Sequence, residues 1–419
     1  MGLRQTLRVA LRAYGPFESA IQKQWESFRG ASGCALRLEA VPFDFHQLYE
    51  HLFEKEELKR GDWDIAFVNT DWLAAVHETG AALDLAPFIE WNPPPDYPAG
   101  WSPSLLRMQC FGDQVVGMPY HDGPECLIYR RDLFENPREQ AAHESQFGEP
   151  LQLPRTWREF HRIARFFTRP QQKLYGTVFA ALPDGHNTVY DYCLQLWARG
   201  GELFDSADHL LINSPPSVAA LEFYRTILND ASACHPDSRA MDSVKSGLAF
   251  ARGEVATMVN WFGFASMAET ASDSRVRGRV DIAELPHEEP ASSASLNVYW
   301  VLAIGRGSPY AQAAYNFLRH CLTPPMDKLL TLGGAIGCRL STWNDSQVNE
   351  AIPFHHRLRD LHTHARELPR RADWPSLASL IDDLVLRTIN SGQPVREVAQ
   401  EVQRKADALA TAAGAHGVL

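Results

Sequence analysis

Polar side chains follow a short apolar run at a point where a buried strand is predicted to end. Residues 61–85 read GDWDIAFVNTDWLAAVHETGAALDL, in which IAFV is followed by Asn69, Thr70, Asp71 and Trp72. An amide, a hydroxyl and a carboxylate can hydrogen-bond to the hydroxyl groups of a ligand, and an indole offers a flat apolar face. This combination suits a neutral polyhydroxylated ligand, although Asp71 could equally serve as the N-cap of the following helix.

The elements that must position these groups form a repeating pattern. Residues 6–14 alternate apolar and polar side chains and predict a strand, and 35–41 and 63–69 predict two more. Apolar residues at helical spacing predict helices after Pro16 and over 43–58. Such a βαβαβ unit forms a parallel, doubly wound sheet, and ligands bind outside the carboxyl ends of its strands. We therefore expect the loops after 14 and after 69 to face a binding crevice.

The middle of the chain continues the alternation of strands and helices. Residues 115–134 predict a strand, a Pro-Tyr-His-Asp-Gly loop and a second strand. Thr156 and Glu159 form a capping box that predicts a helix over 153–168. Strands with polar ends are also predicted near 175–181, at ATMVN and over 297–301, and the C-terminal third is predicted to be helical. The length of 419 residues predicts two lobes rather than one core.

The composition excludes several classes of partner. The formal net charge is −11, and no run of Lys or Arg provides the clustered cations that nucleic acid or an anionic membrane requires. No stretch approaches the roughly 18 apolar residues of a membrane span. The first fifteen residues carry three arginines but no apolar core or small-residue cleavage site, so no secretory leader is predicted there.

The motifs that would indicate a metal, a cofactor or catalysis are missing from the sequence. Seven cysteines are scattered without CxxC spacing, so neither a zinc site nor a disulfide framework is predicted, and the thiols are expected to be buried apolar groups. The histidines at 355, 356, 362 and 364 are expected on helix surfaces. No GxSxG, GxxxxGK[ST] or HExxH motif occurs. A glycosidase would need two carboxylates, and Glu18 with Asp71 or Asp122 leaves that alternative open.

Seven phrases in order resemble the extracellular solute-binding proteins of ABC importers, in the family 1 group that includes maltose-binding protein. The resemblance covers about residues 6–410. The phrases are GDWDIAFVNTDWLAAV, GMPYHDGPECLIYRRDLF, PRTWREFHRIA, LWARGGELFD, FARGEVATMVNWFGFASMAE, VYWVLAIGRGSP followed by AAYNFLRHCL, and the helical tail from DWPSLASLIDDLV onward.

The resemblance implies a two-lobed α/β fold of the type II periplasmic-binding-protein kind, discontinuous in sequence. Each lobe would be a doubly wound sheet with flanking helices, and a ligand would lie between the lobes. We place the crossings near 121–126, 290–296 and 336–341. The N-terminal lobe would comprise 1–121 and 295–337, and the C-terminal lobe 122–294 and 338–419.

The resemblance also implies ligand contacts, most of which fall on loops that the strand pattern marks. The residues so implied are Tyr14, Phe17, Glu18, Asn69, Asp71, Trp72, His121, Asp122, His186, Asn187, Asn260, Trp261, Tyr299, Trp300, Arg339 and Trp374. No catalytic residue, metal or cofactor is implied. Some of these residues also have a plain structural interpretation: Trp261 and Trp374 as core side chains, His121 and Asp122 as turn residues, and Arg339 as an ion pair or hinge contact.

The function implied is that of a monomeric, non-enzymatic carrier. It would capture a sugar, oligosaccharide or polyol by hinge closure and deliver it to the transmembrane permease subunits of an ABC importer. The location would be periplasmic or extracellular if a leader has been removed, with a lipid anchor possible, and cytoplasmic otherwise. The alternatives are a cytoplasmic sugar-sensing binding protein and a glycoside-processing enzyme.

Overall fold

The chain folds into two compact units, each made of segments that are distant in sequence. The computed structural model describes residues 5–416, with side chains up to 409. Unit 1 contains the chain up to Pro124, Asn297–His362 and Glu367–Asp373. Unit 2 contains Glu125–Leu296, Thr363–Arg366 and the chain from Trp374 onward. The points where the chain passes from one unit to the other are called passages below.

Unit 1 is built on a five-stranded sheet in the order β2-β1-β3-β12-β6. Its strands are β1 (Thr6–Arg12), β2 (Arg37–Phe43), β3 (Ile65–Asn69), β6 (Met118–His121) and β12 (Trp300–Ile304). β1 pairs in parallel with β2 and β3, which confirms the predicted βαβαβ unit. β12 is antiparallel to β3 and β6, a reversal that was not predicted. The predicted loop at 119–121 is part of β6.

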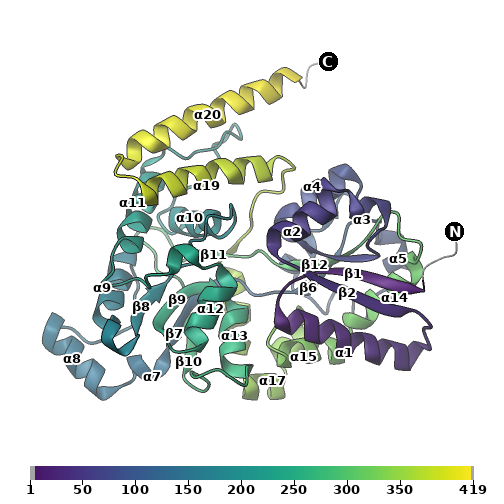
Figure 1. The fold of residues 1–419 in the computed structure, drawn as a ribbon, viewed down its shortest axis with the longest axis horizontal. Helices are drawn as coiled ribbons and strands as arrows, with labels where there is room; N and C mark the ends of the chain where they lie inside the picture. The colour runs from purple at the N-terminus through teal and green to yellow at the C-terminus, as the bar shows by residue number, and fades with distance from the viewer. Residues whose placement is uncertain (1–4, 417–419) are drawn as a thin grey trace. The chain divides into compact units, whose positions relative to one another are not determined.

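Helices cover both faces of this sheet (Figure 1). They are α1 (Gly15–Ser32), α2 (Phe45–Tyr49), α3 (Glu57–Arg60), α4 (Leu73–Thr79), α5 (Ala86–Trp91), α6 (Pro103–Arg107), α14 (Ala311–Cys321), α15 (Pro324–Leu332), α16 (Leu340–Trp343) and α17 (Ser346–Ala351), with α18 (Leu358–Thr363) at a passage. The helix predicted over 43–58 is divided, because a π-helical turn at Glu50–Glu54 separates α2 from α3. A short hairpin joins β4 (Cys110–Phe111) to β5 (Gln114–Val115).

Unit 2 is built on a four-stranded mixed sheet in the order β10-β7-β9-β8. Its strands are β7 (Glu125–Arg130), β8 (Tyr175–Val178), β9 (Val255–Trp261) and β10 (Val280–Ala283), and β11 (Ser295–Leu296) pairs separately with β13 (Ala365–Arg366). In the four-stranded sheet β8 is parallel to β9, whereas β7 is antiparallel to both β9 and β10.

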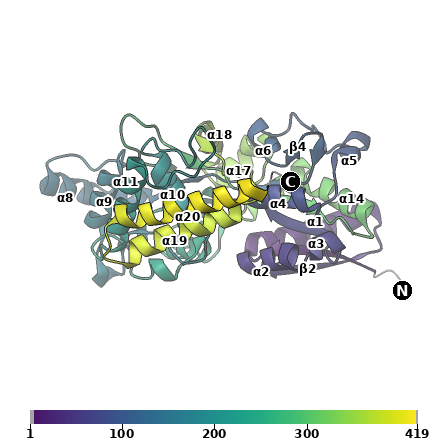
Figure 2. The same cartoon turned by 90° about the horizontal axis from the view of Figure 1, so that it is seen from above.

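The helices of unit 2 include the long pair that ends the chain. They are α7 (Arg131–Phe134), α8 (Pro137–Phe147), α9 (Trp157–Phe167), α10 (Asn187–Trp197), α11 (Pro215–Leu228), α12 (Ser243–Ala251), α13 (Phe262–Thr270), α19 (Trp374–Asn390) and α20 (Val395–His416). The predicted capping box is present, since Thr156 Oγ1 accepts a hydrogen bond from the Glu159 N–H at 3.2 Å. α19 and α20 lie side by side, as both views show (Figures 1 and 2).

The division into units differs from the predicted lobes in two segments. Residues 338–362 and 367–373 were expected in the C-terminal lobe, and a crossing was expected at 336–341, but both segments lie within unit 1. At the start of the first segment the cause is the buried carboxylate of Asp327 on α15. It accepts hydrogen bonds from the N–H groups of Cys338 and Arg339 and from the hydroxyl of Thr342. These contacts hold residues 338–342 against α15 of unit 1.

Candidate functional site

Unit 1 brings residues from four predicted segments together at one edge of its sheet. Asn69 ends β3 and His121 ends β6, while Trp300 begins the antiparallel β12. Trp300 is in register with both Asn69 and His121. Tyr14 caps α1 just after β1, so it lies at the same edge. The loops predicted to face a crevice therefore meet at this edge.

Aromatic side chains gather there into one cluster. The ring centroids of Trp300 lie 6.4 Å from Phe17 and 5.9 Å from Trp72, in edge-on arrangements. Phe17 and Trp72 are only 2% and 4% exposed, so they form the base of the cluster, whereas Trp300 is half-buried. Three further rings were not predicted: Phe45 lies 4.6 Å, Tyr49 5.4 Å and Phe53 5.8 Å from Trp72. The i,i+4 spacing of these residues on a helix is the sequence pattern that could have identified them.

The polar residues after β3 have separate roles. Asn69, not Asp71, is the cap of the turn that follows, because its Oδ1 accepts the N–H of Asp71 at 3.3 Å. Thr70 exchanges two hydrogen bonds with the backbone of Tyr299, at 3.0 and 3.2 Å, and so joins β3 to the start of β12. Asp71 is 9% exposed and lies beside the aromatic cluster, where its charge contributes to the raised pKa of Tyr49 after the larger effects of burial and Glu54.

His121 is a neutral hydrogen-bonding group. Its Nδ1 accepts the N–H of Ile336 at 2.9 Å, so the ring proton lies on Nε2, which can donate. Burial lowers the pKa of His121 to about 4, partly offset by the nearby charge of Asp122. The side chain is half-buried and contacts Phe17 at a centroid distance of 4.8 Å.

Asp122, by contrast, is committed to a contact within unit 1. It is 1% exposed, and its Oδ2 lies 2.7 Å from Nε2 of His362. The ring of His362 stacks on Trp343 at 5.0 Å and 17°. The prediction that His355 and His362 lie on helix surfaces is therefore wrong, because His355 is fully buried and the His362 side chain is 6% exposed.

Tyr299 and Arg339 have structural partners inside unit 1. The Tyr299 hydroxyl lies 2.9 Å from the carbonyl of Leu105 and 3.0 Å from Oε1 of Gln109. The Arg339 guanidinium donates to the carbonyls of Pro95 and Leu322 and to the carboxylate of Asp96, and it lies over the ring of Trp101. Both side chains are at most 1% exposed, and these contacts account for their buried polar groups without a bound ligand.

Unit 2 brings a second set of predicted residues together at the start of α10. The carboxylate of Asp184 accepts the N–H groups of His186 and Asn187 and the Asn187 amide, which fixes this turn. The His186 ring lies 4.3 Å from Tyr190, and Tyr190 is edge-on to Trp261 at 5.6 Å. His186, Tyr190 and Trp261 thus form a smaller aromatic group, in which Trp261 is half-buried.

Two other predicted residues of unit 2 are part of its interior. The Asn260 amide nitrogen donates to the Ser243 carbonyl and to the Ser246 hydroxyl, both at 3.0 Å, so it ties β9 to α12. Trp374 is the first residue of α19 and is 2% exposed. This burial favours the interpretation of Trp374 as a core side chain.

A pair of buried carboxyl groups in unit 2 was not predicted. Glu125 begins β7, opposite Trp261 on β9, and is 5% exposed. Asp191 on α10 is 6% exposed and accepts a 2.6 Å hydrogen bond from the Tyr224 hydroxyl. Burial raises the pKa of Asp191 to about 7, and burial together with the Asp191 charge raises the pKa of Glu125 well above its ordinary value. Both shifts favour the protonated form of the carboxyl groups in the folded state.

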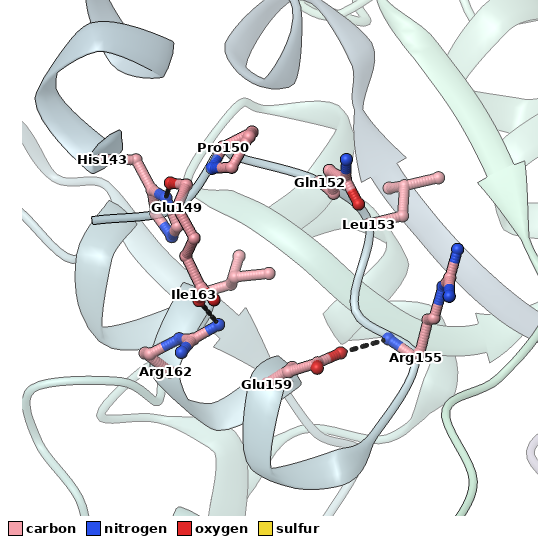
Figure 3. A pocket seen from close by; sticks show the side chains of 9 residues that line it. All are labelled: His143, Glu149, Pro150, Gln152, Leu153, Arg155, Glu159, Arg162 and Ile163. Atoms are coloured by element: carbon pink, nitrogen blue, oxygen red, sulfur yellow. Dashed lines mark hydrogen bonds and ion pairs between the residues drawn. The ribbon is translucent and has the colours of Figure 1, made fainter. Parts of the chain in front are cut away.

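A separate hollow of about 230 Å³ lies between α8 and α9 (Figure 3). Glu149 and Arg162 form an ion pair there, and Glu159 accepts the backbone N–H of Arg155 at 2.8 Å. None of the predicted ligand residues lines this hollow. It contains equal numbers of acidic and guanidinium groups, which favours neither an anion nor a cation.

Metal-ligand clusters, membrane-spanning helices and cysteines were each compared with the expectations from the sequence. Within residues 5–416, no three His, Cys, Asp or Glu side chains are placed to hold a metal ion. None of the helices searched over the same residues is long and apolar enough to cross a membrane. Five of the seven cysteines are buried, as expected for small apolar groups, and Cys34 and Cys110 are half-buried.

Comparison with known proteins defines the class. Residues 34–351 match the model of the bacterial extracellular solute-binding protein family, so this chain belongs to that family. A probable ABC transporter-binding protein of Deinococcus radiodurans is 21% identical over 369 residues, which are 87% of this chain and 83% of that protein. The resemblance drawn from the sequence is thereby confirmed.

Solved structures confirm the two-lobed α/β fold. An ABC transporter solute-binding protein from Agrobacterium radiobacter in complex with ribitol has a TM-score of 0.84 and 22% identity, covering 96% of this chain and 98% of that one. The maltose-bound MalE3 of T. maritima has a TM-score of 0.84 and 21% identity, covering 96% and 99%. A solute-binding protein from Agrobacterium vitis with bound D-mannitol has a TM-score of 0.84 and 17% identity, covering 98% and 99%.

Proposed function

We propose that this protein is the carbohydrate-binding subunit of an ABC importer. The observation that carries the proposal is the edge of unit 1, where a half-buried indole, a carboxylate and a neutral imidazole lie together at the strand ends. Aromatic rings pack against the C–H faces of sugars, and the polar groups exchange hydrogen bonds with hydroxyls. Family membership and the sugars and polyols named for the similar structures support the same class of solute.

The proposed ligand contacts are fewer than the sequence implied. Residues that are half-buried, or that hold polar groups at the two aromatic groups, are retained. They are Tyr14, Glu18, Asn69, Asp71, His121 and Trp300 in unit 1, and His186, Asn187 and Trp261 in unit 2. Phe17 and Trp72 support the rings above them. Asp122, Asn260, Tyr299, Arg339 and Trp374 are assigned to the interior of their units.

Capture by hinge closure is part of the proposal. Each unit has its own core and its own candidate contacts, and the chain passes between the units after Pro124, Leu296, His362, Arg366 and Asp373. Short connections of this kind allow rigid units to rotate when one ligand contacts both. The predicted result is a smaller radius of gyration in solution scattering at saturating ligand, and an unchanged radius would contradict closure.

The proposed partners are the transmembrane subunits of an ABC permease, with the protein acting as a monomer outside the cytoplasm and without enzymatic activity. A thermal-shift screen with monosaccharides, oligosaccharides, polyols and sugar acids tests the binding function, because a ligand of the folded state raises its apparent stability. Calorimetry on each hit should give a dissociation constant with no release of product. No stabilisation by any of these compounds would refute the carbohydrate assignment, and turnover of a hit would indicate the enzyme alternative.

A further inference from the structure

The hollow between α8 and α9 contains a buried histidine that has no part in the proposed carbohydrate contacts (Figure 3). His143 on α8 is 1% exposed and lines the hollow. Its Nδ1 donates to the carbonyl oxygen of Glu149 at 2.9 Å, so Nε2 of the neutral ring is an acceptor. Among the described residues, Nε2 has no hydrogen-bond partner. Because a buried acceptor without a partner is costly, this atom indicates a ligand that supplies a donor.

A donor without a partner lies near this acceptor. Arg162 on α9 also lines the hollow and forms an ion pair with the carboxylate of Glu149. The rings of His143 and Phe147 are 4.7 Å apart, and the Arg162 guanidinium lies 5.5 Å from the centre of the same Phe147 ring. Nε of Arg162 is buried and has no hydrogen-bond partner within residues 5–416. The hollow therefore offers an unused neutral acceptor and an unused cationic donor within a short distance of each other.

Arg155 adds a second guanidinium that has no acidic partner. It is exposed and lines the hollow, and its side chain makes no hydrogen bond or ion pair with the described residues. The two carboxylates of the hollow are both engaged, since Glu149 pairs with Arg162 and Glu159 accepts the N–H groups of Arg155 and Thr156. Cationic donors therefore remain available, and the buried imidazole is the acceptor that remains with them.

The size and charge of the hollow narrow the class of ligand. Its volume of about 230 Å³ is several times the roughly 30 Å³ that one water molecule occupies in the liquid, and it is below the range of pockets for drug-sized molecules. Its two carboxylates and two guanidinium groups already balance. A net anion or a net cation would leave one charge in excess, whereas a ligand that carries both charges would not.

We propose that this hollow binds a small zwitterion of the α-amino acid type, at a site separate from the proposed carbohydrate contacts. The carboxylate of the ligand accepts hydrogen bonds from the guanidinium of Arg155 and from Nε of Arg162, and its ammonium group donates to Nε2 of His143. Each of these hydrogen bonds involves a charged group, and such bonds are about twice as strong as neutral ones.

Calorimetric titration of the full chain with glycine, L-alanine and L-serine tests the inference. At least one of them is expected to bind with a dissociation constant of about 1 mM or tighter. Propionate and ethylamine are L-alanine without its ammonium group and without its carboxylate. Both are expected to bind at least about tenfold more weakly than L-alanine, because each leaves one set of partners unused.

Two substitutions locate the binding in the hollow. His143→Asn keeps an N–H group for the Glu149 carbonyl but has no atom in place of Nε2, and Arg155→Gln removes the exposed guanidinium. Each is expected to weaken amino acid binding by about tenfold or more. Arg158→Gln is the matched control, because Arg158 is also exposed near the start of α9 but does not line the hollow. Melting temperatures establish that all three variants are folded.

Three outcomes would overturn the inference: no binding of any of the three amino acids, binding of propionate or ethylamine as tight as that of L-alanine, and unchanged affinity in both His143→Asn and Arg155→Gln. None of these outcomes affects the proposed function, because carbohydrate affinity is measured separately.

Discussion

The imidazole of His362 lies 2.7 Å from the carboxylate of Asp122, although the two residues are 240 positions apart in sequence. Both are close to passages, since the chain leaves unit 1 after Pro124 and again after His362. The contact therefore fastens two of the points where the chain leaves unit 1 to each other. Both side chains are almost completely buried, so water cannot take the place of either hydrogen-bonding partner.

Removal of this contact is expected to destabilise unit 1. His362→Ala leaves the Asp122 carboxylate buried without its hydrogen-bond donor, and the expected loss is about 2 kcal/mol or more in the free energy of unfolding. Urea denaturation followed by tryptophan fluorescence measures it. His46→Ala is the control, because His46 is exposed. Equal unfolding midpoints for the two variants would show that the pair contributes nothing.

Asp327 is expected to be more important than an ordinary capping residue. Asp327→Ala leaves the N–H groups of Cys338 and Arg339 without their acceptor, at about 1–3 kcal/mol for each buried group. Asp345→Ala is the comparison, because Asp345 caps α17 nearer the surface and should cost about 1 kcal/mol. Denaturant unfolding should rank the two variants in that order, and a smaller loss for Asp327→Ala would contradict the assigned role.

The buried carboxyl pair of unit 2 predicts a stability that falls as the pH rises. Burial in the folded state raises the pKa of Asp191 to about 7, and burial together with the Asp191 charge raises that of Glu125 well above its ordinary value, so the folded state binds more protons than the unfolded state. Stability from this pair is highest in mild acid and declines until the pH exceeds both folded pKa values. His121 and His355, whose pKa values are lowered to about 4, act oppositely below pH 6.5.

Comparison of variants isolates the effect of the pair. Glu125→Gln removes one titrating group, so its melting temperature should decline less than that of the wild type as the pH rises from mild acid to mild alkali. Glu222→Gln, an exposed site in unit 2, should follow the wild type. Melting curves at a series of pH values provide the measurement. Parallel declines for all three proteins would mean that Glu125 does not titrate with folding.

Trp261 and Trp374 are expected to respond differently to truncation. Trp374 is 2% exposed, so Trp374→Ala should cost about 3–5 kcal/mol of stability. Trp261 is half-buried beside Tyr190, and Trp261→Ala should instead weaken carbohydrate binding by about 2 kcal/mol with a smaller loss of stability. Melting temperature and calorimetric affinity should be measured on both variants. A loss of affinity for Trp374→Ala and a loss of stability for Trp261→Ala would show that Trp374 is the ligand contact and Trp261 the core residue.

Binding is expected to be independent of metal ions and of thiol redox state. Within the described residues no side chains cluster as metal ligands, and five of the seven cysteines are buried. Affinity for the identified carbohydrate should therefore be the same in EDTA and in dithiothreitol as in plain buffer. A loss of affinity in either reagent would show that a cation or a disulfide is involved.

The sequence by itself determined the features that depend on neighbouring residues. Alternation and helical spacing predicted β1, β2 and β3 with their helices, and the Thr156–Glu159 capping box marked the start of α9. These signals are readable because strand periodicity and capping involve residues within a few positions of one another. The polar groups at strand ends, such as Asn69 and Asp71, could be located for the same reason.

Only the tertiary structure decided which of the candidate side chains are committed to the interior. Arg339 contacts Asp96 across 243 positions and Asp122 contacts His362 across 240, and no local pattern encodes either contact. Antiparallel β12 reaches the sheet of unit 1 from beyond residue 296, and it brings Trp300 beside Trp72. Long-range pairing depends on the closure of the whole chain around its cores, so the aromatic cluster with Phe45 and Tyr49 emerges only after folding.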